Sequence, residues 1–328
     1  MNAAVPDSAG TAQPEWVQAA GNQSRLAFGL ALTDMADRDE SVVAVAADTL
    51  DLIGLRALGK KYPGRLIDVG IAEQNAMGVA SGLATTGLRP FLCGYAPFIT
   101  ARSMEQLRND VAYANQRVVI GAAASGISLG VAGGTHHALE DLALMRSLPN
   151  LTVIAPADAH QAWHATHATD RIDGPVYIRL GGRVEEPPVT PVDGPFTVGK
   201  AETLRAGNDV TVIACGCLVA PALDAANELA ADGVQARVLN MHTIKPLDRD
   251  AILAAAAETR GIVTAEEHHL TGGLGGAVAE LLAENHPTPM RLIGMPDEFA
   301  IVGPTGQVRE RYGMSAAHIR DACRDLIE

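Results

Sequence analysis

The sequence predicts an α/β fold made of two doubly wound domains, each with a mostly parallel sheet. Short apolar runs that resemble buried strands alternate with stretches of helical period, which is typical of parallel sheets covered by helices. A stretch rich in glycine and proline, residues 182–196, interrupts this alternation near the middle of the chain. A chain of 328 residues is long enough for about two domains, each with its own core.

In the first half, each predicted strand ends near a glycine, proline, aspartate or serine, as strands of such folds do. Strands are expected at residues 42–47, 65–69, 90–94, 118–122, 151–154 and 176–180. Between them, helical periods cover residues 76–86, 100–114 and 160–171. Asp158 precedes the last of these helices and is expected to cap its N-terminus.

The second half repeats the α/β pattern after the linker. Strands are expected at residues 210–214, 236–240 and 261–265, with helices at 220–231 and 249–257. The glycines of residues 272–276 precede a helix expected from Ala277, where they could cradle a phosphate or permit close backbone packing; we favour packing. The sequence thus predicts a flexible tail at 1–15, a first domain at 16–181, the linker at 182–196 and a second domain at 197–328.

Composition excludes several classes of partner. The net charge of −13 argues against binding to nucleic acid and to anionic membranes, since both favour basic surfaces. No apolar stretch approaches the roughly 20 residues of a membrane span, and the N-terminus lacks the features of a secretory signal. Four cysteines are too few for a disulfide framework, and Cys215 and Cys217 are expected to be buried free thiols rather than a metal or redox pair. We expect a cytoplasmic protein.

Two short motifs place polar side chains in otherwise small and apolar surroundings. Residues 68–75 have the sequence Asp-Val-Gly-Ile-Ala-Glu-Gln-Asn, and residues 133–141 have Gly-Gly-Thr-His-His-Ala-Leu-Glu-Asp. Glu73, in the first motif, is expected to be buried, and burial favours the protonated form of a carboxyl group. Taken singly, Glu73 could be a structural carboxylate and His136 a loop histidine; their order and spacing favour a functional site.

The two motifs, followed by Glu-Glu-His-His-Leu-Thr-Gly-Gly-Leu-Gly-Gly from residue 266, resemble the C-terminal two thirds of transketolases and deoxyxylulose-phosphate synthases. The resemblance extends from about Arg25 to Glu328 and is strongest to the smaller subunit of a split transketolase. It implies a pyrimidine-binding domain followed by the transketolase C-terminal domain. It also implies thiamin diphosphate as cofactor, with Glu73 hydrogen-bonded to the aminopyrimidine ring so that the cofactor loses its C2 proton.

The resemblance assigns further residues around the cofactor and substrate. Phe98 matches the ring that stacks on the aminopyrimidine, with Tyr95 beside it, although both could be core aromatics at a strand end. Asp48 resembles an acid near the thiazolium ring. His136 matches the histidine that contacts the substrate, and a neutral imidazole can donate or accept a proton near pH 7.

Four arginines are candidate substrate cations. Three of them, Arg25, Arg179 and Arg183, are candidates for a substrate phosphate, because guanidinium groups match phosphate oxygens well. Arg25 stands where the family has a substrate arginine, and Arg102 follows Phe98 by one helical turn. Arg179 and Arg183 flank the turn that ends the last strand of the first half. Each of the four could equally be a surface charge.

The sequence contains no Gly-Asp-Gly, which in this superfamily begins the site for Mg²⁺ and the cofactor diphosphate. We therefore expect a separate diphosphate-binding subunit to hold Mg²⁺, with the active site at the interface of the two subunits. The resemblance to split transketolases implies an α2β2 assembly. The expected reaction is transfer of a two-carbon ketol unit between sugar substrates, which are phosphorylated in the family.

One position departs from the family. Ala132 stands where transketolases have an acid that recognises a substrate hydroxyl, and residues 122–128 lack the usual basic side chain. An ordinary pentose-phosphate pair is thus in doubt, and a modified sugar or a small ketoacid donor becomes a candidate. Two alternatives stay open: a decarboxylating acyl or ketol transferase of a specialised pathway, and a regulatory partner without catalysis.

Overall fold

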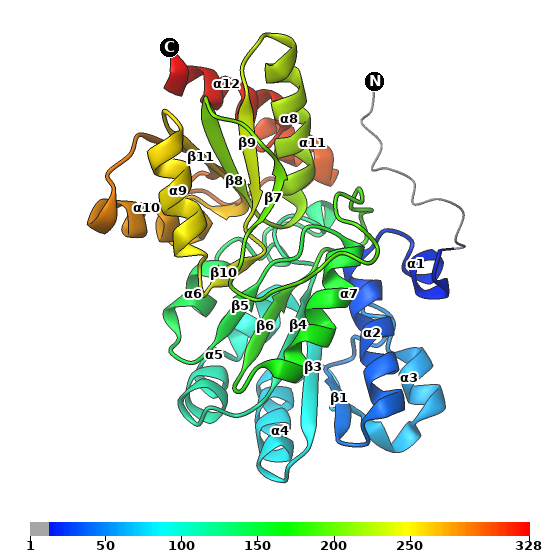
Figure 1. Ribbon diagram of the computed structural model, residues 1–328. Coiled ribbons are helices and arrows are strands. Elements are labelled where there is room, and N and C mark those ends of the chain that lie inside the picture. The colour runs from blue at the N-terminus through cyan, green and yellow to red at the C-terminus, as the bar shows by residue number, and fades with distance from the viewer. Residues whose placement is uncertain (1–12) are drawn as a thin grey trace.

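A computed structural model describes residues 13–328, which form two α/β units built on separate sheets (Figure 1). The first sheet has seven strands in the order β10-β5-β6-β4-β3-β1-β2, and the second has five in the order β12-β11-β8-β9-β7. All neighbouring strands are parallel except the pairs β10–β5 and β7–β9. The predicted fold class, two α/β domains with mostly parallel sheets, is confirmed.

The first sheet consists of β1 (Val42–Ala46), β2 (Leu66–Asp68), β3 (Arg89–Tyr95), β4 (Val119–Ala123), β5 (Thr152–Ile154), β6 (Val176–Arg179) and β10 (Thr243–Lys245). Its helices are α1 (Glu15–Ala20), α2 (Ser24–Arg38), α3 (Arg56–Lys61), α4 (Glu73–Thr85), α5 (Met104–Gln106), α6 (Asp141–Ser147) and α7 (Ala159–Ala168). Short 3-10 turns occur at η1 (Pro63–Arg65), η4 (Gly130–Ala132) and η5 (Thr169–Arg171), and π-helical turns at η2 (Phe98–Arg102) and η3 (Leu107–Tyr113).

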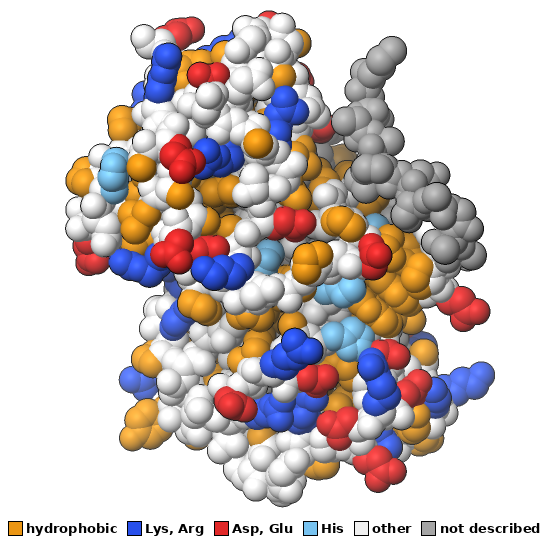
Figure 2. Space-filling model, in the orientation of Figure 1, with side chains coloured by type: hydrophobic (Ala, Val, Ile, Leu, Met, Phe, Trp, Pro, Cys, Tyr) orange, Lys and Arg blue, Asp and Glu red, His pale blue; other side chains and the backbone are white. Residues whose placement is uncertain are grey.

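The second sheet consists of β7 (Glu202–Arg205), β8 (Val210–Ala214), β9 (Ala236–Asn240), β11 (Ile262–His269) and β12 (Met290–Met295). Around it lie the 3-10 turn η6 (Gly216–Leu218) and the helices α8 (Val219–Ala231), α9 (Arg249–Glu258), α10 (Leu274–Asn285), α11 (Thr305–Arg311) and α12 (Ala316–Ile327). Within residues 13–328, no helix is both long and apolar enough to cross a membrane. Charged side chains of both signs are interspersed over the face seen in Figure 2.

Successive residues of the first sheet point to opposite sides, and both faces are buried because helices cover each of them. One face packs Leu92 and Ile120 against α4 and α6 and continues into apolar residues of the second half. The other face packs Phe91 and Val119 against α2 and α7, which lie side by side in Figure 1. A third apolar cluster fills the second sheet. The strands are thus fixed from both sides, and their carboxyl ends form a rigid edge.

The nine predicted strands all occur, with ends displaced by a few residues at most, except that β11 continues to His269. Strands β7, β10 and β12 were not predicted. The helix expected at 100–114 is wrong as a single element, because it is divided into η2, α5 and η3. The helix expected from residue 76 begins at Glu73. Of the predicted tail at 1–15, residues 1–12 lie outside the described part, and α1 begins at Glu15.

The linker runs along α7 and is fixed to it by Asp158. This side chain caps α7, as predicted, by accepting the Gln161 N–H, and it also accepts the backbone N–H groups of Val189 and Thr190 at 2.7 Å. His160 contacts the Thr190 carbonyl at 2.7 Å. The two halves are therefore joined by an ordered connector.

The cysteines are free, as predicted. Cys215 is buried and Cys217 half-buried, and both lie in the turn after β8. The pKa of the Cys215 thiol is held well above its ordinary value by burial, so this thiol stays protonated at neutral pH.

Candidate functional site

The residues expected to form the site follow strands that are neighbours in the first sheet. Asp48 comes after β1, Glu73 begins α4 after β2, Phe98 follows β3, and His136 lies in the loop after β4. Strand β3 lies between β1 and β4, and all of these strands are parallel. Their carboxyl ends meet at one edge, which is where open α/β sheets bind ligands.

Glu73 is buried, as its motif predicted, with 3% of its surface exposed. It is the first residue of α4, where a carboxylate interacts favourably with the helix N-terminus. Its Oε2 atom lies 2.6 Å from Nη1 of Arg102, whose side chain is 46% exposed. A buried carboxylate thus contacts a cation that reaches solvent.

An aromatic cluster links this ion pair to His136. The rings of Tyr95 and Phe98 have centroids 5.9 Å apart, and the His136 ring lies edge-on at 5.2 Å from Phe98 and 6.0 Å from Tyr95. The guanidinium carbon of Arg102 lies 4.3 Å from the Phe98 centroid. Glu73, Arg102, Phe98, Tyr95 and His136 therefore form one continuous set of contacts, although they span more than sixty positions of the sequence.

The π-helical turn η2 places Phe98 and Arg102 in this cluster. Such turns are rare and often occur at functional sites, because they shift side chains relative to an α-helix. The turn packs closely on the end of β3: a Cβ atom at Gly94 would lie 2.7 Å from the Ile99 side chain. Thr100 and Ser103 donate to the Ala96 and Ile99 carbonyls at 2.6 and 2.8 Å.

The loop that carries His136 is held by backbone contacts. Gly126 and Ala138 form an isolated bridge, and the His136 N–H donates to the Gly133 carbonyl at 2.9 Å. Gly133 has a φ of 77°, in the region that favours glycine. His136 is half-buried, and its Nδ1 atom lies 3.0 Å from the Thr135 hydroxyl.

His137, the neighbour of His136, is a different kind of residue. It is 5% exposed, and its Nε2 atom contacts the Gly130 carbonyl at 3.3 Å. Burial lowers the pKa of His137, so its imidazole is neutral at pH 7. Its Nδ1 atom has no hydrogen-bond partner among the residues that the structure describes.

Asp48 adopts a left-handed backbone conformation, with a φ of 56°, directly after β1. Non-glycine residues seldom adopt this conformation, and they often do so at functional sites. The Asp48 N–H donates to Oδ1 of Asp68 at 2.9 Å, and the Asp48 side chain is exposed at the same edge of the sheet. Asp68 therefore supports the turn that presents Asp48.

The other three arginines differ in their surroundings. Arg25 is 8% exposed, and its guanidinium donates to the carbonyls of Leu52 and, at 2.8 Å, Gly182. Burial lowers the pKa of Arg25, and the charge of the nearby, exposed Arg183 lowers it further. Arg25 thus connects the loop after β1 to the turn after β6, and this structure does not present its guanidinium as an open phosphate site.

Arg179 lies in the interior. It is 6% exposed and donates to both carboxylate oxygens of Asp141, at 2.8 and 3.0 Å, and to the Glu267 carbonyl at 2.8 Å. Asp141 also accepts the Tyr177 hydroxyl at 2.7 Å. Burial alone would lower the pKa of Arg179, but the Asp141 carboxylate raises it by more, so Arg179 stays charged. Arg179 therefore forms a structural ion pair within the first half and a hydrogen bond to the second half, and its guanidinium is not open to a substrate in this structure.

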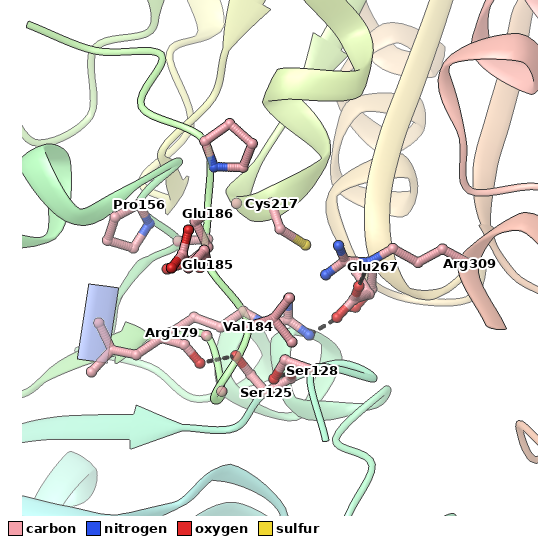
Figure 3. A pocket seen from close by; sticks show the side chains of 16 residues that line it. Ser125, Ser128, Pro156, Arg179, Val184, Glu185, Glu186, Cys217, Glu267 and Arg309 are labelled. Carbon is pink, nitrogen blue, oxygen red and sulfur yellow. Dashed lines mark hydrogen bonds and ion pairs between the residues drawn. The ribbon is translucent and has the colours of Figure 1, made fainter. Parts of the chain in front are cut away.

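A second set of polar residues, which sequence reasoning missed, lines a pocket between the halves (Figure 3). Arg309 extends from α11 and pairs with Glu267, while Glu186 approaches from the linker. Burial raises the pKa of Glu186 to about 7. No local motif marks these residues, and only the Glu-Glu-His-His run that contains Glu267 signalled that this region is unusual.

The glycines of residues 272–276 serve packing, the interpretation favoured from the sequence. The carboxylate of Glu266 accepts the N–H groups of Leu274 and Gly275, both at 2.7 Å, and so occupies the N-terminus of α10. A Cβ atom at Gly273 would lie 2.0 Å from the same carboxylate. The chain's own side chain therefore fills the position that a phosphate would need.

Comparison with known proteins shows the family of this chain. Residues 21–183 match the pyrimidine-binding domain of transketolase, and residues 199–319 match the transketolase C-terminal domain. This chain belongs to the transketolase family. Membership of this family implies dependence on thiamin diphosphate.

Two similar relatives are separate subunits. The chain is 42% identical to the 6-deoxy-6-sulfo-D-fructose transketolase subunit SqwH of Clostridium sp. (strain MSTE9), over 90% of this chain and 92% of the relative. It is 40% identical to a subunit of the apulose-4-phosphate transketolase of Phocaeicola vulgatus, over 93% and 96% of the two chains. It is also 41% identical to 1-deoxy-D-xylulose-5-phosphate synthase 1 of Geobacter sulfurreducens, but spans 46% of that protein.

A solved structure has the same fold. It is a split-gene transketolase in the form of an inactive beta4 tetramer, with a TM-score of 0.86 and 40% identity, and the match covers 94% of this chain and 99% of that chain. The family resemblance predicted from the motifs is therefore confirmed, including its similarity to separate transketolase subunits.

Proposed function

We propose that this chain is the pyrimidine-binding subunit of a split transketolase that transfers a two-carbon ketol unit between sugar substrates. The observation that carries the proposal is the buried Glu73 carboxylate, which Arg102 links to the Phe98 ring, with His136 in contact with the same ring. An aminopyrimidine ring needs an acid at its edge and an apolar face, and these residues fit both requirements.

Each residue of the site has its own task in this proposal. Bound thiamin diphosphate supplies the nucleophilic carbon that accepts the two-carbon unit. Glu73 holds a proton at the edge of the aminopyrimidine, where burial keeps water from competing. Phe98 and Tyr95 provide apolar surface for the ring, and Asp48 stands at the same edge of the sheet, toward the rest of the cofactor. His136, half-buried at the rim, exchanges a proton with a substrate hydroxyl.

The diphosphate and Mg²⁺ are assigned to a partner subunit. Among residues 13–328, no group of three or more histidine, cysteine, aspartate or glutamate side chains is placed to hold a metal ion. Mg²⁺ prefers several oxygen ligands in octahedral geometry, and we assign the protein ligands among them to the partner. The relatives are named as subunits, which agrees with this division, and we propose an α2β2 assembly in the cytoplasm.

Exposed apolar side chains beside the His136 loop support a subunit interface at this edge. Val131, Phe299 and Val302 are 70, 87 and 67% exposed. The Gly303 N–H donates to the Gly130 carbonyl at 3.2 Å, which ties their two loops together. A group of exposed apolar side chains next to a binding site is typical of a protein contact surface.

The substrate is proposed to be a sugar that lacks, or presents differently, the hydroxyl recognised by the usual family acid. Ala132 ends η4 and is exposed in the loop that carries His136, so no carboxylate stands at this position. Arg183 is exposed near the buried Arg25, and we assign Arg183 to a substrate phosphate.

The proposal is tested by Glu73→Gln in the enzyme assembled with its partner. The amide keeps the shape and a hydrogen bond but cannot share a proton, so H/D exchange at C2 of the bound cofactor, followed by NMR, should slow by about 10²–10⁴-fold. The matched control is Glu105→Gln, an exposed carboxylate that should leave exchange unchanged. Normal exchange in the Glu73 variant would make this residue structural and sink the proposal.

A further inference from the structure

Arg102 contacts both groups that the proposed function assigns to the aminopyrimidine ring. Its Nη1 atom lies 2.6 Å from Oε2 of Glu73, and its guanidinium carbon lies 4.3 Å from the Phe98 centroid. The Glu73 side chain is 4% exposed and that of Arg102 is 46% exposed. Arg102 thus reaches from the surface to the base of the site.

The two contacts are those that an aminopyrimidine would also use. A guanidinium is flat and delocalised, stacks by its face on aromatic rings, and donates hydrogen bonds in its plane to carboxylates. A flat heteroaromatic ring can stack on Phe98 and direct a ring nitrogen to Glu73 in the same way. A ring on the same face of Phe98 would compete with the guanidinium for this space and for the contact with Glu73.

The other residues of the cluster leave this space to Arg102. His136 meets Phe98 edge-on, with an interplanar angle of 73°, and Tyr95 meets it with an angle of 62°. Neither ring is stacked on Phe98, so the stacked position is taken by the guanidinium.

We propose that Arg102 occupies the aminopyrimidine position in the cofactor-free subunit and is displaced into solvent when the cofactor binds. The inference rests on the proposed function, and it replaces the substrate contact expected for Arg102 from the sequence. In the free subunit, Arg102 pairs with a carboxylate that would otherwise be buried and uncompensated. The exposure of Arg102 gives the side chain a route outward without opening the core.

The displacement should lower the apparent affinity for the cofactor. A ligand that binds only the open arrangement has a dissociation constant raised in inverse proportion to the open fraction. The charge-assisted pair with Glu73 favours the closed arrangement. Removing the guanidinium should therefore favour cofactor binding, whereas removal of a substrate-binding cation should leave that binding unchanged.

The test is calorimetric titration of thiamin diphosphate, with Mg²⁺ present, into the enzyme assembled with its partner subunit. Arg102→Ala should bind the cofactor about 3- to 30-fold more tightly than wild type. Arg108→Ala, which removes an exposed arginine from the same segment, is the matched control and should match wild type. If Arg102→Ala does not fold, Arg102→Gln removes the charge with a smaller change in volume.

Each other outcome overturns the inference. Unchanged cofactor affinity with a raised KM would make Arg102 a substrate-binding residue, unchanged affinity with normal kinetics would make it a surface charge, and weaker affinity would make it a cofactor ligand. The wild-type titration tests the proposed function separately, because the absence of cofactor binding there would refute that function itself.

Discussion

Glu186 offers a sharp test of the electrostatics between the two halves. Its Oε2 atom accepts the Ser24 backbone N–H at 2.7 Å, and the carboxyl lies against Gly181. Burial raises the pKa of Glu186 from 4.5 to about 7, and the charge of Asp158 adds to this, while the Ser24 hydrogen bond and Arg309 oppose it. Glu186→Gln replaces an ionisable group with a neutral one of the same shape.

The magnitude follows from the difference between the folded and unfolded pKa values. The folded state binds the proton more tightly, so the stability due to Glu186 is fully present below pH 4.5 and is lost as the pH rises through about 7. A rise of this size corresponds to a loss of about 3 kcal/mol at pH 8, most of which arises between pH 5 and pH 8. Because Gln does not ionise, the variant keeps this stability at high pH. It should be about 1–3 kcal/mol more stable than wild type at pH 8, and nearly equal to it at pH 5.

The assay is urea unfolding of both proteins at pH 5, 6, 7 and 8. Burial also raises the pKa of Glu266 to about 7, so the wild-type curve contains both groups, and the difference between variant and wild type isolates Glu186. Glu185→Gln, an exposed neighbour, is the control and should follow the wild-type curve. A stability difference that is the same at pH 5 and pH 8 would refute the reasoning, because it would not depend on ionisation.

Three further predictions concern the ion pair, the substrate and acid stability. Asp141→Asn leaves the buried Arg179 cation without its carboxylate and should lower the free energy of unfolding by about 3–5 kcal/mol in urea; a loss below about 1 kcal/mol would contradict the role given to the pair. Ala132→Asp should shift kcat/KM of the assembled enzyme by about 10- to 150-fold toward a donor that carries the usual hydroxyl, compared with a deoxygenated donor, because a charge-assisted hydrogen bond contributes about 1.5–3 kcal/mol; an unchanged ratio would show that another residue makes this contact. Burial lowers the pKa of His242 and His268 to about 4. The stability that each contributes as a neutral group is therefore lost as the pH falls from 6.5 through 4, and the melting temperature should decrease over that range. Replacement of either histidine by Gln should make this decrease shallower.

The strands that the sequence predicted are those whose burial follows from their own residues. Residues 210–214 form β8 as expected because every side chain is apolar or small and both faces of the sheet are covered. Strand β10 was missed because its three residues, Thr243–Lys245, contain a single apolar side chain. Its conformation depends on pairing with β5, about ninety positions earlier, and local sequence does not encode such a partner.

The arrangement of the candidate site was predictable where a motif fixes both residue type and backbone. Glu73 and His136 come from motifs, and the burial of Glu73 follows from its small, apolar neighbours. The contact between Arg102 and Glu73 could not be derived, because it depends on the π-helical turn that replaces part of an expected helix. The burial of Arg179 was also hidden, since its partner Asp141 is 38 positions away on α6.

Strand β10 determines how the chain can be divided. By sequence it belongs to the second half, yet it forms the outer strand of the first sheet, antiparallel to β5 (Figure 1). A fragment that ends in the linker would leave the hydrogen-bonding groups of β5 open, and an unprotected edge strand is a template for aggregation. Neither half is therefore a portable module: exchange of the first domain between relatives must carry Thr243–Lys245 with it, and a break in the linker separates two pieces that still share a sheet.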